Sequence, residues 1–252
     1  MNILFLVFQQ TMFFSIPLLI VALGGVFTER SGVTNIALDG MMIMGAFTSI
    51  FFINQMESSM SGQSLLLIAI VIATVTGMVF SLLHAYAAVN LKADQIISGT
   101  ALNMFAPAFA IFTARMIQTN GVQQINFINS FRIHSVPVLG DIPVIGGLFF
   151  QNAYITTYLG FVILIVSVIV LYKTKFGLRL RACGEHPHAA DSVGINVYKM
   201  RYAGVMISGA LAGLGGLVFV IPTSTNFNAT VSGYGFLALA VMIFGQWKPL
   251  RV

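Results

Sequence analysis

Charged side chains are scarce in this sequence. Asp, Glu, Lys and Arg together make up 8% of the 252 residues, whereas apolar residues make up 58% and the mean hydropathy is +0.93. A soluble domain carries roughly 25% charged residues. Water alone cannot cover a surface so poor in charge, so the sequence predicts a single integral membrane unit over residues 1–252 rather than soluble domains.

Cysteine and catalytic motifs are equally sparse. Cys183 is the only cysteine, which excludes an intramolecular disulfide and leaves no basis for a metal site. The sequence contains no GxxxxGK[ST] phosphate loop, no HExxH and no GxSxG. We therefore expect no enzyme activity and no cofactor bound by this chain. The net charge of +5 does not form a basic face with interleaved aromatics, so nucleic acid is not an expected partner.

Long apolar runs dominate what is present. A helix needs about 20 apolar residues to cross the bilayer core, and a helix satisfies its own backbone groups. The sequence therefore predicts an all-α polytopic fold with six or seven transmembrane helices. The six full-length runs are Ile3–Phe27, Val33–Ile53, Ser64–Val89, Gln95–Ala114, Tyr154–Tyr172 and Tyr202–Ile221. A seventh run, Gly235–Trp247, is shorter than a full crossing.

Orientation follows from the distribution of cations. If residues 173–201 are cytoplasmic and Gly235–Trp247 crosses, ten of the twelve Lys and Arg residues lie on the cytoplasmic side. Only Arg115 and Arg132 lie outside. Cytoplasmic loops are enriched in Lys and Arg, so we expect the N-terminus outside and residues 118–152 to form an external loop, part irregular and part surface helix.

The cytoplasmic loop contains a short predicted helix. Pro187 suits the first turn of a helix, and Gly194 suits the residue just past its end. Two turns are too short to be stable alone, so this helix needs a packing partner. Its small Ala189 and Ala190 and its basic flanks are typical of an element that docks against another protein.

This loop resembles a known family. The string Gly177-Leu-Arg-Leu-Arg-Ala-Cys-Gly-Glu-His-Pro187, followed by Ala189-Ala190 and Gly194-Ile195, is similar to the coupling loop of ATP-binding-cassette (ABC) importer permeases for simple sugars, nucleosides and branched-chain amino acids. Residues 23–40, Leu-Gly-Gly-Val-Phe-Thr-Glu-Arg-Ser-Gly-Val-Thr-Asn-Ile-Ala-Leu-Asp-Gly, look most like the nucleoside permeases.

The resemblance implies partners and roles. A separate ATPase subunit would hold ATP-Mg and receive the coupling helix, a second permease subunit would pair with this chain, and an extracytoplasmic binding lipoprotein would deliver the solute in a bacterial plasma membrane. The implied ATPase-coupling residues are Glu185, Pro187, Ala189, Ala190, Gly194 and Ile195. Family members usually continue beyond Lys248-Pro249, so the resemblance leads us to expect further C-terminal helices and a chain truncated at this end.

Each polar residue inside the predicted spans fits either a functional or a structural role. Thr100 and Asn103 form a polar stripe before Pro107, which fits either a solute path or hydrogen bonds between helices. Asp39 fits a gate or helix pairing, or a carboxylate favoured by a helix start. For His84, an interhelical hydrogen bond competes with a pathway role.

Two further segments are candidates. Thr225, Asn226, Phe227 and Tyr234 fit an external mouth that bonds hydroxyls and stacks on a ring, or an ordinary loop. Gly209, Gly213 and Gly216 recur at helical spacing and predict a close helix-packing face. Together the observations favour a nucleoside importer permease, with simple sugars second. The rival is an ion-gradient-driven transporter or channel, for which only Asp39 offers an embedded acid.

Overall fold

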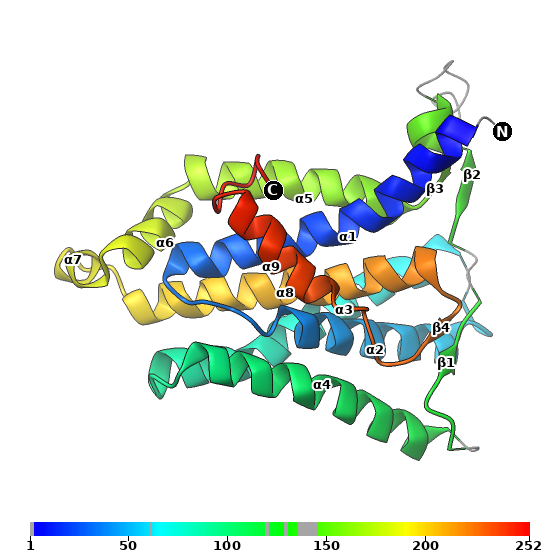
Figure 1. The fold of residues 1–252 in the computed structure, drawn as a ribbon, viewed down its shortest axis with the longest axis horizontal. Helices are drawn as coiled ribbons and strands as arrows, with labels where there is room; N and C mark the ends of the chain where they lie inside the picture. The colour runs from blue at the N-terminus through cyan, green and yellow to red at the C-terminus, as the bar shows by residue number, and fades with distance from the viewer. Residues whose placement is uncertain (1–2, 61, 119–120, 129–130, 136–145) are drawn as a thin grey trace.

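The computed structural model describes residues 3–60, 62–118, 121–128, 131–135 and 146–252 (Figure 1). The α-helices are α1 Ile3–Ser31, α2 Leu38–Met56, α3 Gln63–Ala85, α4 Gln95–Ile117, α5 Ile155–Lys173, α6 Lys175–Glu185, α7 Pro187–Ser192, α8 Val197–Thr223 and α9 Tyr234–Phe244. Two π-helical turns, η1 Tyr86–Asn90 and η2 Gly146–Phe150, and four short strands, β1 Ile125–Asn126, β2 Ile133–Ser135, β3 Gln151–Ala153 and β4 Asn226–Phe227, complete the described elements.

The predicted helical membrane architecture is confirmed. Among the described residues, α1, α3, α4, α5 and α8 are long and apolar enough to cross a membrane. α2 is less apolar because it carries Asp39, Asn54 and Gln55, but its 19 residues span about 28 Å and it lies inside the bundle against α3, α4 and α8. Contacts with other helices therefore replace lipid over much of its surface.

Helix α8 is the centre of the bundle. It packs along α1, α2 and α3, while α4 and α5 lie on the outside (Figure 1). Glycines allow this close approach, because a methyl group at Gly213 would overlap the backbone of Ala73 and Gly77. One at Gly216 would overlap the backbone of Met42. Small residues that bring helix backbones together are the usual basis of packing in membranes, where no hydrophobic effect drives helices together.

The predicted start of the second span at Val33 is wrong. Residues 33–36 are not helical, and α2 begins only at Leu38, part-way along the bundle rather than at the end where α1 stops (Figure 1). Asn35 donates from Nδ2 to Ser208 Oγ at 3.0 Å. Ser208 lies about 16 Å along α8 from its first residue, so this non-helical segment lies at membrane depth.

Side chains from other helices satisfy the backbone of this break. Asn103 accepts from the Gly40 amide at 2.7 Å and donates to the Ile36 carbonyl at 2.8 Å. His84 Nε2 lies 3.0 Å from the Thr34 carbonyl, which requires the ring proton on Nε2. The Thr34 amide donates to Gln95 Oε1 at 2.7 Å. Irregular backbone is tolerated at membrane depth only where protein groups replace water in this way.

Helix α9 also begins inside the bundle. The Gly235 amide donates to Asp39 Oδ1 at 3.0 Å, so Asp39 caps α9 while lying in the first turn of α2. Both helix starts favour a negative charge. The 11 residues of α9 span about 16 Å, so this helix is shorter than a full crossing, as the length of the apolar run Gly235–Trp247 indicates. Arg30 nevertheless donates to the Trp247 carbonyl at 3.1 Å, which places the end of this segment beside the end of α1.

The opposite end of the bundle carries short antiparallel ladders, and the helical turn η2 also falls within the predicted external loop of residues 118–152. β1 pairs with β4 and β2 pairs with β3. Arg132 donates from Nε to the Asn152 carbonyl at 3.2 Å at this end. Part of that predicted loop, residues 119–120, 129–130 and 136–145, lies outside the described residues.

Candidate functional site

Two candidate sites lie at opposite ends of the bundle. The first is the α7 end, where α1 and α5 stop and α8 begins, and the second is the β-strand end (Figure 1). Residues 173–201, predicted as one loop, form α6, α7 and the first residues of α8. α7 projects beyond the other helices at its end of the molecule, so its outer surface is available to another protein.

Local sequence signals explain α6 and α7. Thr174 caps α6 by accepting from the Gly177 amide at 3.1 Å. Pro187 occupies the first turn of α7, where no amide donor is needed. Gly194 has φ +82, a left-handed conformation that favours glycine, and the Ile195 amide donates to the Ala190 carbonyl at 3.1 Å. The six-residue α7 thus has defined ends and packs against α6 and α8.

The structure brings most of the predicted coupling residues around one hollow. This hollow of about 240 Å³ is lined by Ala182, Glu185, His186, Ala189, Ala190, Val193 and Ile195. Ala190 is 4% exposed and packs inward, whereas Ala189 is exposed and Val193 is 74% exposed. The hollow is lined mainly by apolar groups at an exposed end of the molecule, which makes it a candidate docking surface. Of the remaining two predicted residues, Pro187 lies on the other side of α7 and Gly194 ends the helix.

Cys183 lies inside the α7 end rather than on its surface. Its side chain is buried, and burial raises the pKa of the Cys183 thiol, an effect that the nearby positive charge of Arg201 opposes. A protonated, buried thiol is a poor nucleophile. A reporter cysteine for labelling this end therefore has to be placed elsewhere.

The second candidate site is a polar hollow at the β-strand end. Its volume is about 210 Å³, and its lining residues are Phe219, Val220, Thr223, Ser224, Asn226, Phe227, Asn228, Thr230 and Ser232. Phe219 packs against Tyr234 with ring centroids 4.2 Å apart. Of the four predicted mouth residues, Asn226 and Phe227 line the hollow and Tyr234 supports it. Thr225 is exposed and contributes its backbone carbonyl, which accepts from the Phe127 amide.

The polar stripe predicted on α4 divides between two environments. Asn103 uses both amide atoms on the break before α2, which favours the interhelical alternative for this residue. Thr100 is exposed, and its hydroxyl donates to the Ile96 carbonyl of its own helix. α4 continues unbroken through Pro107 to Ile117, so this proline does not end the helix.

The predicted packing glycines lie at helix crossings. Gly209 and Gly213 contact α3, and Gly216 contacts α2. Their partners Gly45 and Gly77, which occupy the same crossings on α2 and α3, are not among the predicted residues. Both are single glycines inside apolar runs, a signal that indicates a close approach but does not identify the partner helix.

Comparisons with known proteins agree with this architecture. Residues 7–252 match the family model described as branched-chain amino acid transport system, permease component. The chain is 46% identical over 254 residues to the guanosine ABC transporter permease protein NupQ of Bacillus subtilis, covering 99% of this chain and 78% of that protein. It is 44% identical over 250 residues to the nucleoside ABC transporter permease protein NupC of Lactococcus lactis, with the same coverage.

A second protein of Lactococcus lactis is also similar. The nucleoside ABC transporter permease protein NupB is 26% identical over 251 residues, covering 94% of this chain and 65% of that protein. No solved structure matches the chain.

Proposed function

This chain belongs to the branched-chain amino acid transport system permease family, and from that premise we propose that it imports nucleosides across a bacterial plasma membrane as the membrane-spanning subunit of an ATP-driven importer. The supporting observation is the 46% identity over nearly the whole chain to a guanosine permease. The relatives are transport components, and energy for transport comes from a separate ATPase subunit.

ATP-driven uptake distinguishes this proposal from an ion-gradient-driven transporter. We expect proteoliposomes containing the permease with its partner permease, the cognate ATPase and the binding lipoprotein, with ATP on the α7 side, to accumulate labelled guanosine in the presence of a protonophore and a sodium ionophore. Unlabelled adenosine should compete, and glucose should not. Uptake that stops when the ion gradients collapse, but ignores ATP, would contradict the proposal.

The proposed orientation places the α7 end in the cytoplasm and the N-terminus outside. Several basic side chains lie at the α7 end. Arg30 donates to the Trp247 carbonyl there, and Lys92 and Arg201 line one pocket. Arg115 and Arg132 belong to the opposite half of the molecule. Placing the richer end inside agrees with the cation bias of cytoplasmic loops.

Cysteine labelling tests this orientation. In a Cys183→Ala background, Ser192→Cys adds an exposed thiol to α7, and Asn228→Cys adds one to the β-strand end. We expect a membrane-impermeant maleimide to label the second variant in intact cells and the first only after permeabilisation. Labelling of Ser192→Cys in intact cells would reverse the assignment.

The hollow at the β-strand end is the proposed outer part of the solute path. Its hydroxyl and amide groups suit the ribose and base edges of a nucleoside, and Phe227 offers a ring wall. Its volume is below the roughly 300–1,000 Å³ of complete ligand pockets, so other surfaces must complete the site. A second permease subunit, the same or different, is the proposed source. The two similar nucleoside permeases of one organism support a pair of different subunits.

Removing the Asn226 side-chain amide from this hollow tests the proposed solute path. The only hydrogen bond recorded for the Asn226 side chain among the described residues is a long 3.4 Å contact from Ser224 to its Oδ1. We therefore expect Asn226→Ala to raise the KM for guanosine uptake about fivefold to tenfold, the loss of one net hydrogen bond. Thr225→Ala is the matched control, since that side chain is not among the lining residues. Equal KM values for the two variants would place the path elsewhere.

A further inference from the structure

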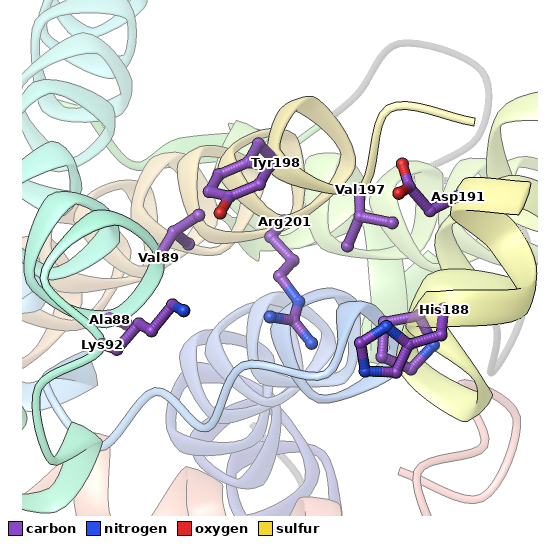
Figure 2. Close-up of a pocket in the computed structure, with 9 residues that line it drawn as sticks. Ala88, Val89, Lys92, His188, Asp191, Val197, Tyr198 and Arg201 are labelled. Atoms are coloured by element: carbon purple, nitrogen blue, oxygen red, sulfur yellow. The ribbon is translucent and has the colours of Figure 1, made fainter. Parts of the chain in front are cut away.

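A second pocket at the α7 end is not used by the proposed transport mechanism. Its volume is about 400 Å³, and it lies between η1, α7 and the start of α8, on the opposite side of α7 from the apolar hollow (Figure 2). The lining residues are Ala88, Val89, Lys92, Pro187, His188, Asp191, Val197, Tyr198 and Arg201. This volume is within the range of pockets that hold small ligands.

The basic side chains that line this pocket lie close to one another. Figure 2 shows the Arg201 guanidinium lying between Lys92 and His188, with the Lys92 side chain directed toward it. In Figure 2 the carboxylate of Asp191, the one acidic lining residue, lies apart from the guanidinium, beyond Val197. Two fixed positive charges, Lys92 and Arg201, therefore line the same pocket with one carboxylate.

Arg201 also has an unmet hydrogen-bond donor. Its Nε is buried and has no hydrogen-bond partner among the described residues. A buried donor without a partner costs free energy, and for a charged group this cost is larger. An acceptor bound in the pocket would remove that cost, which points to an anionic oxygen ligand.

The start of α8 also lines this pocket. Val197 and Tyr198 occupy the first turn of this 27-residue helix, and Asn196 accepts from the Lys199 amide at 2.9 Å. The first amides of a helix have no partner within the helix, and the helix dipole there favours negative charge. Helix starts combined with cations are recurrent phosphate sites.

The surroundings indicate the source of the anion. Lys92 directly follows Leu91, which is 62% exposed, and Tyr86 and Ile96 on either side are also exposed. These apolar side chains lie on η1, on the turn after it and on the first turn of α4, between two helices long and apolar enough to cross a membrane. A ligand that combines a phosphate with acyl chains would place its head group on Arg201 and Lys92 and its chains along this surface.

We propose that this pocket binds the phosphate of an anionic lipid of the inner leaflet. The leaflet rests on the proposed orientation of the importer, whereas the phosphate chemistry rests on the pocket itself. Basic pockets between helices on the cytoplasmic side are known to bind lipid head groups. A phosphate between Lys92 and Arg201 would join η1 to α8 beside the coupling helix and so fix the base of α7.

Native mass spectrometry of the purified chain tests this site without requiring transport. After addition of phosphatidylglycerol, the wild-type chain should retain at least one lipid, and Lys92→Gln and Arg201→Gln should each retain about fivefold less, as expected for one surface cation. Lys92→Gln alters an exposed loop residue and so guards against misfolding of the Arg201 variant. Arg179→Gln, an exposed cation on α6 that does not line the pocket, is the control and should match the wild type.

Separate arms identify the ligand source. Phosphatidylcholine should bind much less than phosphatidylglycerol, and inorganic phosphate or AMP at millimolar concentration should not displace the lipid. Equal retention by all variants, or binding of free phosphate in place of lipid, would overturn the proposal. So would displacement of the lipid by the cognate ATPase, which would make the pocket a protein-docking surface. Because the readout is lipid mass, a failure of nucleoside uptake leaves this result unaffected.

Discussion

Gly213→Leu should abolish recovery of folded protein. Gly213 lies where α8, α3 and α2 cross. A side chain on Gly213 would meet the backbone of Ala73 and Gly77 on α3, and Gly45 of α2 packs against the Gly213 backbone. A side chain there meets backbone atoms, which cannot rotate away as a flexible side chain can. Overpacking typically costs about 1–3 kcal/mol and sometimes more, and with no movable neighbour we expect the upper part of that range or beyond.

The measurement is the yield and thermal stability of monodisperse protein in detergent. Gly213→Ala should lower the apparent Tm, and Gly213→Leu should leave little folded protein. Ala210→Leu is the matched control, because Ala210 lies on the same helix but is only half-buried. A Gly213→Leu protein as stable as the Ala210→Leu control would show that α8 does not need this close approach.

The number and approximate position of the long helices could be predicted from the sequence, because an apolar run of bilayer length has few alternatives. The break before α2 could not. Val33, Ile36 and Ala37 continue the apolar pattern. They obscure two local signals, Gly32 with φ +81 and Asn35, whose Oδ1 accepts from the Ala37 amide. The groups that make the break tolerable, His84 and Asn103, come from helices far along the chain.

The candidate site shows the same division between local and distant information. Pro187 and Gly194 mark the ends of α7 locally, so the short helix was predicted. Leu180 and Cys183 of α6 are buried at helical spacing, a signal that was present but read as loop because the segment is rich in cations. The pocket around Arg201 depends on Lys92, more than a hundred residues away, and no single stretch of sequence contains it.

Ala189→Arg should separate the permease from its ATPase without unfolding it. Ala189 is exposed and lines the apolar hollow beside Val193, so an arginine there projects into the surface proposed to enter the ATPase cleft. Residues at the centre of an interface carry most of its binding free energy. A bulky charged side chain at such a position should weaken ATPase binding on the order of 30-fold or more.

The neighbouring alanine separates docking from folding. Ala190 is buried, so Ala190→Arg should lower the yield of folded protein itself. Ala93→Arg adds the same side chain at an exposed alanine in the turn between η1 and α4, outside the apolar hollow, and should behave as wild type.

Co-purification of the cognate ATPase with the tagged permease, together with ATP-dependent guanosine uptake, is the measurement. Ala189→Arg should elute as folded protein, as Ala93→Arg does, yet lose both the ATPase and uptake. Full recovery of the ATPase with Ala189→Arg would show that α7 is not the docking element. A six-residue helix that is too short to be stable alone would then owe its order to α6 and α8 only, and transmission of ATPase closure to the bundle would require another contact at this end.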